Sequence, residues 1–212
     1  GSPLSHLGLV SQIVMRLGAT ATVVDYRLAP EHPYPAAIED CITVYQALLE
    51  EVNPSSLVVA GDSAGGGAAL ATVVALRDAG DPPPACLYLM SPWTDLTLSG
   101  ETYQTMRSVD PLVPPGGIDS HLRLMDDLVD GYRGAEDASH PGISPLFADL
   151  AGLPPILVQV GGDELLLSDS TVLAERAEAA GVEVELDVAD GMWHVWQFLS
   201  PWLPEARGAL DK

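Results

Sequence analysis

Three residues that together could carry out acyl transfer occur in the chain in the order serine, aspartate, histidine. Ser63 lies in the run GDSAG, Asp163 in VGGDE and His194 in DGMWHVW. A serine hydroxyl is a poor nucleophile until an imidazole takes its proton, and the imidazole needs a carboxylate that orients it. The amide of Ala64, the residue after the serine, is placed to bind the oxyanion that forms during attack. The pattern predicts a Ser-His-Asp triad.

Each assignment has a competing interpretation. A G-x-S-x-G motif arises by chance in about one chain in ten of this length, so the motif gains weight only because a strand-like run precedes it and a small-residue helix follows. Asp163 could be an exposed loop acid, and Asp169 is a second candidate for the triad acid that also suits a helix N-cap. His194 could be a core histidine, but its place after the last strand favours the base. The remaining histidines are assigned structural roles: His6, His32, His121 and His140.

The elements that must position these residues alternate along the chain. Five apolar runs predict strands at 20–26, 56–61, 85–91, 154–161 and 182–188. Segments with helical spacing lie at 35–51, 64–80, 117–131 and 170–181. Near-continuous apolar strands separated by helices predict an α/β fold, with a mostly parallel sheet that has helices on both faces. In such sheets ligands bind at the carboxyl ends of the strands, where the three candidate residues lie.

Residues 92–153 interrupt this alternation with a stretch rich in Pro, Gly and Asp. We interpret it as a pocket-forming insertion within a single catalytic domain that spans residues 1–212. Small-molecule sites are mostly apolar, and large apolar residues flank the predicted catalytic loops. The residues expected to line a substrate pocket above Ser63 are Trp93, Met106, Leu112, Trp193 and Trp196.

The composition excludes several classes of function. The chain has 212 residues, with 30 acidic against 9 basic side chains and a net charge of −21, so it repels nucleic acid and anionic lipid. No apolar run is long enough to span a membrane, and the first residues lack the features of a signal peptide. The two cysteines, Cys41 and Cys86, suit neither a metal cluster nor a disulfide framework. We expect no metal, no cofactor, a small-molecule partner and a cytoplasmic location, with a homodimer left open.

Five ordered motifs resemble one known family: DYRLAPEHPYPAAIED, GDSAGGG, SPWTDLT, GGDE and GMWHVWQ. They are similar to the bacterial hormone-sensitive-lipase-like (family IV) esterases of the α/β-hydrolase superfamily, and most of all to members labelled monoterpene ε-lactone hydrolases. The resemblance implies a serine carboxylic-ester hydrolase acting on short acyl esters or lactones, with the triad Ser63, Asp163 and His194. It also implies that residues 26–35 brace the active-site side of the sheet. The alternative is a catalytically silent ligand-binding member of the fold, as plant gibberellin receptors are.

One departure from the family pattern concerns the start of the chain. The family carries a His-Gly-Gly-Gly motif, whose amides bind the oxyanion, shortly before a Gly-Ser-x-x-x-His stretch. Here residues 1–6 are GSPLSH, and the glycine motif is absent from the sequence. The family's strand order also places a further strand between 20–26 and 56–61. We therefore expect a gap in the sheet with unpaired strand edges, which an upstream segment would fill.

Overall fold

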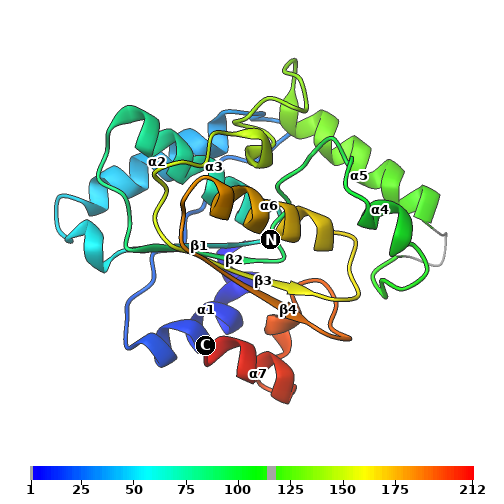
Figure 1. The fold of residues 1–212 in the computed structure, drawn as a ribbon. Coiled ribbons are helices and arrows are strands. Elements are labelled where there is room, and N and C mark those ends of the chain that lie inside the picture. Colours follow the sequence, from blue (N-terminus) through cyan, green and yellow to red (C-terminus); the bar gives the residue numbers. More distant parts are fainter. Residues whose placement is uncertain (1, 114–117) are drawn as a thin grey trace.

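A parallel sheet of four strands forms the centre of the molecule (Figure 1). The computed structural model describes residues 2–113 and 118–212. The strands lie in the order β1 (Val58–Asp62), β2 (Cys86–Met90), β3 (Ile156–Gly161) and β4 (Val184–Ala189). Each pairs with its neighbour in parallel, so the carboxyl ends of all four meet at one edge of the sheet. This confirms the predicted α/β class.

Helices cover both faces of this sheet. Figure 1 shows α2, α3 and α6 on one face, and α1 and α7 on the other. The α-helices are α1 (Pro3–Leu17), α2 (Ala36–Leu48), α3 (Ala64–Ala79), α4 (Thr102–Thr105), α5 (Ile118–Arg133), α6 (Leu167–Ala179) and α7 (Pro204–Leu210). Short 3-10 helices lie at η1 (Pro54–Ser56), η2 (Pro145–Phe147) and η3 (Trp196–Leu199). The predicted helix 117–131 corresponds to α5, although residue 117 itself lies outside the described residues.

The two faces of the sheet are set by the alternation of side chains along each strand. On β2, Leu87 and Leu89 belong to the main core with Leu70 of α3 and Leu173 of α6. Tyr88 and Met90, which alternate with them along the strand, pack instead with Leu9 of α1 on the opposite face. Because successive strand residues point to opposite faces, near-continuous apolar strands produce a core on each side.

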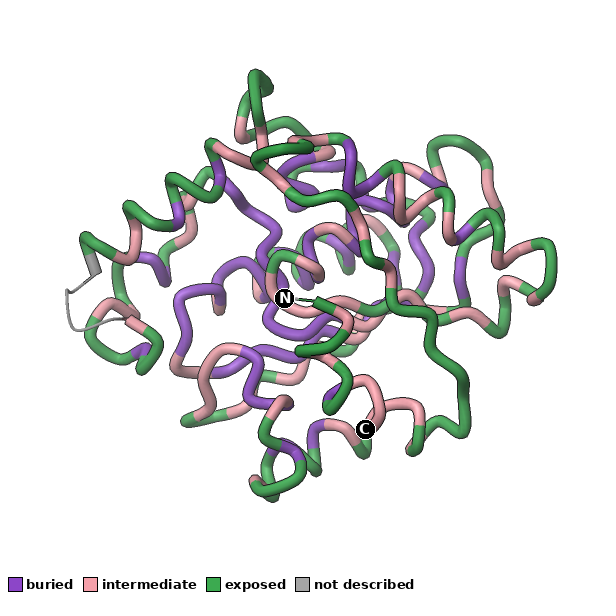
Figure 2. Tube along the Cα trace, turned by 180° about the vertical axis from the view of Figure 1, so that it is seen from behind, coloured by how far each residue is buried: buried purple, intermediate pink, exposed green. Residues whose placement is uncertain are grey.

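Residues 20–26 do not form the strand that the sequence predicts. They have no regular secondary structure and are mostly exposed, with Val23 44% accessible (Figure 2). A β-branched run becomes a strand only when another strand satisfies its N–H and C=O groups, and β1 does not pair with this segment. Val58 on β1 is 46% accessible, and the sheet of the described residues ends at β1.

The insertion 92–153 packs onto the segment that leads into α6. Its apolar residues form a second cluster with Leu165 and Leu166. The buried members contributed by the insertion are Trp93, Leu96, Tyr103, Met125, Val129 and Ile143. The insertion is therefore held near the carboxyl ends of the strands, where a site is expected.

Asp169 fixes this insertion rather than capping a helix. The N-cap role predicted for it is wrong, because α6 begins at Leu167 and Asp169 lies inside the first turn, 1% exposed. Its Oδ2 accepts hydrogen bonds from the backbone N–H groups of Thr94 and Asp95, each at 2.8 Å, and its Oδ1 accepts one from the Tyr103 hydroxyl at 3.2 Å. Burial raises the pKa of Asp169 to about 7, although the two backbone hydrogen bonds oppose the shift.

This raised pKa predicts how stability changes with pH. An unfolded aspartate has a pKa of about 3.9, so between about pH 4 and pH 7 the folded protein holds a proton on Asp169 that the unfolded chain has lost. The contribution of this group to the free energy of unfolding therefore falls as pH rises. Relative to Asp169→Asn, which does not titrate, we expect wild-type stability to fall by up to about 1.4 kcal/mol per pH unit over this range.

Urea unfolding at several pH values measures this difference. Glu175→Gln is a suitable control, because Glu175 lies on the same helix with an exposed side chain. A difference between wild type and Asp169→Asn that stays constant from pH 4 to pH 7 would contradict the assignment.

Candidate active site

Ser63 occupies a sharp turn between β1 and α3. Its backbone has φ 55° and ψ −125°, a strained conformation for a residue with a side chain, and this turn presents the hydroxyl at the carboxyl edge of the sheet. The Ser63 N–H donates to the carbonyl of Met90 at 2.9 Å, and its carbonyl accepts from the N–H of Trp93 at 2.9 Å. The turn is therefore tied to the residues at the end of β2.

The glycines around Ser63 allow close approach of backbone segments. A Cβ at Gly61 would overlap the carbonyl of Gly65, and a Cβ at Gly67 would overlap the carbonyl oxygen of Trp93. At Gly66 a Cβ would lie 2.8 Å from the Cβ of Pro92. The glycine-rich run is thus required by the packing of the first turn of α3 against the turn and the end of β2.

His6 of α1 holds Asp62, the residue before Ser63. Its Nε2 lies 3.2 Å from Oδ1 of Asp62, and its Nδ1 lies 3.0 Å from the Ser5 hydroxyl. The ring also meets Phe198 edge-on, with 5.0 Å between ring centroids. These contacts agree with the structural role that the sequence assigns to His6.

His194 reaches Ser63 from the loop after β4. Its Nε2 is 2.9 Å from Ser63 Oγ, and its Nδ1 is 3.0 Å from Oε1 of Glu164. An ionised carboxylate can only accept, so Nδ1 carries the proton and Nε2 is free to accept the serine proton. The three side chains form the hydrogen-bonded chain that acyl transfer requires.

The carboxylate beside His194 is that of Glu164, not of Asp163 as expected. The turn after β3 directs the Glu164 side chain inward, where it is 0% exposed and its Oε2 accepts from the N–H of Gly161 at 2.8 Å. Asp163 is only half-buried and uses its backbone N–H to bind the carbonyl of Met192. The acid that contacts His194 is therefore one residue further along the chain than the acid predicted from the sequence.

A small hollow of about 160 Å³ opens beside Ser63 and His194. The insertion and the segment before α6 supply the rest of its lining: Trp93, Asp110, Leu112, His121, Met125, Leu165 and Leu166. Of the five residues expected to line a pocket, the structure places Trp93 and Leu112 there. His121, to which the sequence assigned a structural role, also lines it.

The other three expected pocket residues lie elsewhere. Trp196 is 1% exposed and packs against α7, and Trp193 packs on the same cluster. Met106 packs with the apolar cluster of the insertion and does not line the hollow. The loop that carries His194 turns its tryptophans toward α7, which the spacing of aromatic residues alone does not reveal.

Comparisons with known proteins identify relatives of the chain. A family model described as "alpha/beta hydrolase fold" matches residues 1–198. The chain is 41% identical to an acetyl-hydrolase of Streptomyces hygroscopicus over 100% of this chain and 69% of that protein. It is also 41% identical to an esterase of Acinetobacter venetianus, over 99% of this chain and 68% of the relative. The crystal structure of an esterase from the bacterial hormone-sensitive lipase family superimposes with a TM-score of 0.93 at 43% identity, covering 100% of this chain and 69% of that one.

The chain belongs to the bacterial hormone-sensitive-lipase family of α/β-hydrolase-fold esterases. The N–H of Ala64 is the first of α3, and a helix leaves its first N–H groups without an intrahelical acceptor. This donor lies next to Ser63, and its role at an oxyanion site remains the prediction made from the sequence. Residues 1–212 contain no His-Gly-Gly-Gly run.

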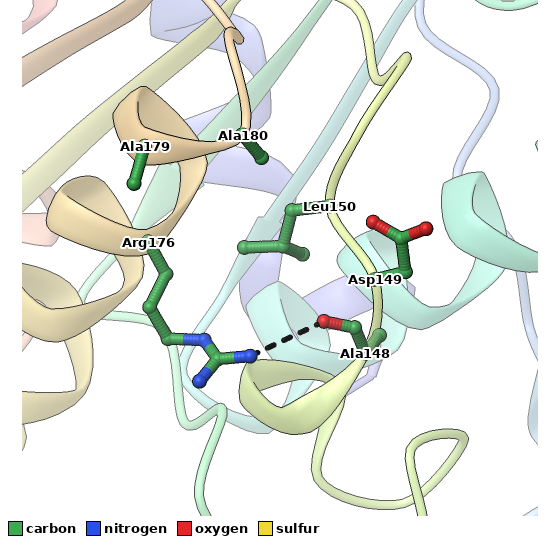
Figure 3. A pocket seen from close by; sticks show the side chains of 6 residues that line it. All are labelled: Ala148, Asp149, Leu150, Arg176, Ala179 and Ala180. Atoms are coloured by element: carbon green, nitrogen blue, oxygen red, sulfur yellow. Dashed lines mark hydrogen bonds between the residues drawn. The ribbon is translucent and has the colours of Figure 1, made fainter.

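A larger hollow of about 350 Å³ lies away from the candidate site at Ser63 (Figure 3). It is lined by Ala148, Asp149, Leu150, Arg176, Ala179 and Ala180. These residues come from the end of α6 and the loop before β3, so the hollow lies at the amino end of the sheet. Arg176 contacts the carbonyl of Ala148 there, at 3.5 Å, and the lining residues include no serine, cysteine or histidine.

Two further kinds of feature are absent from the described part of the chain. Within residues 2–113 and 118–212, no cluster of three or more His, Cys, Asp or Glu side chains is arranged to hold a metal ion. No helix in this described part of the chain has both the length and the apolar character needed to cross a bilayer.

Proposed function

We propose that the site is that of a serine carboxylic-ester hydrolase with Ser63 as nucleophile, His194 as base and Glu164 as the orienting acid. The observation that carries the proposal is the unbroken hydrogen-bonded chain from Ser63 Oγ through both nitrogens of His194 to a fully buried carboxylate. Membership of an esterase family adds support from an independent source.

The chemistry follows from the atoms in contact. As Ser63 Oγ attacks the acyl carbon, His194 Nε2 takes the hydroxyl proton, and the Glu164 carboxylate stabilises the imidazolium. The carbonyl oxygen becomes an oxyanion next to the Ala64 N–H. Nε2 then protonates the leaving alcohol, which leaves an acyl group on Ser63. Water attacks this acyl-enzyme by the same proton transfers, and the acid product departs.

The hollow favours short acyl groups. Its volume of about 160 Å³ is small, and its walls are largely apolar, with Trp93, Leu112 and Met125 among them. One relative is named an acetyl-hydrolase, which agrees with a small acyl group in that protein. A lactone would use the same steps, with its alcohol still attached to the acyl chain after ring opening.

The test is labelling by a small, uncharged fluorophosphonate. We expect stoichiometric modification of Ser63 and none in Ser63→Ala, with Ser139→Ala, an exposed serine, as the matched control. A series of p-nitrophenyl esters should show turnover falling as the acyl chain outgrows the hollow. Labelling that persists in Ser63→Ala would refute the nucleophile, and equal cleavage of acetyl and long-chain esters would refute the shaped pocket.

A further inference from the structure

We propose that Ser91 is a positioning residue that couples the acid and the base of the triad. This inference rests on the proposed function. Ser91 directly follows β2, is 0% exposed and has φ 45°, a left-handed conformation that is uncommon for a residue other than glycine. A serine buried in this conformation next to the catalytic groups indicates a role for its hydroxyl.

The hydroxyl of Ser91 connects two loops that carry triad residues. Its Oγ donates to Oε2 of Glu164 at 2.8 Å and accepts from the N–H of Val195 at 3.0 Å. The backbone N–H of Ser91 also donates to the carbonyl of Gln159 on β3, at 2.7 Å, which fixes its position against the sheet. One hydroxyl thus joins the acid to the residue that follows the base.

The bond to Glu164 determines which way the carboxylate faces. Oε2 accepts from Ser91 and from the N–H of Gly161, both at 2.8 Å, while Oε1 is left for His194 at 3.0 Å. Two donors on one carboxylate oxygen fix the plane of the group. With only the Gly161 donor on Oε2, the carboxylate is held less firmly, and the direction of Oε1 toward the imidazole is less strictly fixed.

The bond from Val195 acts on the other partner. Val195 has φ 50°, a left-handed conformation that is strained for a β-branched residue. Its N–H is held by Ser91 Oγ, so this hydrogen bond stabilises the turn that directs the His194 ring. The acid and the base are therefore positioned by the same hydroxyl.

Residues on either side of Ser91 form hydrogen bonds with the backbone of Ser63. The carbonyl of Met90 accepts from the N–H of Ser63, and the N–H of Trp93 donates to the carbonyl of Ser63, each at 2.9 Å. The four residues from 90 to 93 thus contact the segments of all three triad members. Within this segment, Ser91 is the residue whose side chain makes the connection.

Ser91→Ala and Ser91→Gly test the proposal together. Both remove the hydroxyl, but glycine also relieves the positive φ, so it separates loss of the hydrogen bonds from backbone strain. Ser144→Ala is the matched control, because Ser144 is also 0% exposed and its Oγ also accepts from one backbone N–H (Leu96) and donates elsewhere (the carbonyl of Ala138).

We expect both Ser91 variants to lower the limiting rate of fluorophosphonate labelling by about 10–100-fold, because each loses a hydrogen bond to a charged group. The concentration for half-maximal labelling should stay within about twofold of wild type. The proton between His194 Nδ1 and Glu164 should give a strongly deshielded NMR resonance in wild type and in Ser144→Ala. This resonance should be absent from the spectra of both Ser91 variants.

Several results would overturn the proposal. These are a labelling rate within twofold of wild type in Ser91→Gly, an equal loss in Ser144→Ala, or an unchanged resonance in a folded Ser91 variant. If the wild-type chain is not labelled, the proposed function is refuted instead. In that case the presence of the His194–Glu164 resonance in wild type and its loss in the Ser91 variants still test the role of Ser91.

Discussion

Glu164→Gln is expected to lower the rate at which Ser63 reacts with a fluorophosphonate by about 10³–10⁴-fold. The Glu164 carboxylate accepts the proton of His194 Nδ1, which keeps Nε2 unprotonated and stabilises the imidazolium during attack. An amide that turns its NH2 group toward Nδ1 favours the opposite tautomer, in which Nε2 carries the proton and cannot accept one. The measurement is the second-order rate of labelling, followed by intact mass.

Asp163→Asn provides the matched control for this change. It neutralises the adjacent acid in the same turn, and we expect a labelling rate within about threefold of wild type, because Asp163 does not contact His194 in the hydrogen-bonded chain. Thermal melting of both variants should show that each is folded. If Asp163→Asn were the inactive variant and Glu164→Gln the active one, the acid assigned here would be incorrect.

Gly67→Ala is expected to destabilise the fold by about 3 kcal/mol or more. A Cβ at this position would overlap the carbonyl oxygen of Trp93, which is a backbone atom. Trp93 cannot move away without disturbing its hydrogen bond to the carbonyl of Ser63. Urea unfolding, or loss of folded protein on expression, measures the effect.

Gly65→Ala is the control in the same motif. Apart from its chain neighbours and the helix's own backbone, nothing lies within 4 Å of a Cβ built at Gly65, and the residue lies in the first turn of α3. Alanine has a higher helix propensity than glycine, by up to about 1 kcal/mol, so Gly65→Ala should leave stability unchanged or raise it. Equal stability of the two alanine variants would show that the close approach at Gly67 does not constrain the fold.

The sequence determined the fold class and two members of the candidate triad. Strand-like apolar runs that end in glycine-rich or polar loops mark the carboxyl ends of parallel strands, and Ser63 and His194 both follow such runs. The glycines after Ser63 also indicate the turn, because only a glycine tolerates such close approach of backbone. These signals are local, and they are therefore readable from neighbouring residues in the chain.

The tertiary structure alone decided which acid faces the base and which residues line the hollow. Asp163 and Glu164 are adjacent acids, and the backbone of one turn selects Glu164, so composition and spacing cannot separate them. Trp196 is directed toward α7 and His121 toward the hollow by the packing of a loop and a helix.

Whether the first predicted strand forms depends on pairing between segments that are distant in the sequence. The β-branched run at 20–26 has the composition of a strand, yet it is not one in the described structure, because no neighbouring strand binds its backbone. Strand propensity depends on the residues themselves, whereas strand formation depends on a partner that lies elsewhere in the fold. For the same reason, the direction of a side chain and the neighbours of an edge strand are settled only when the whole chain has packed.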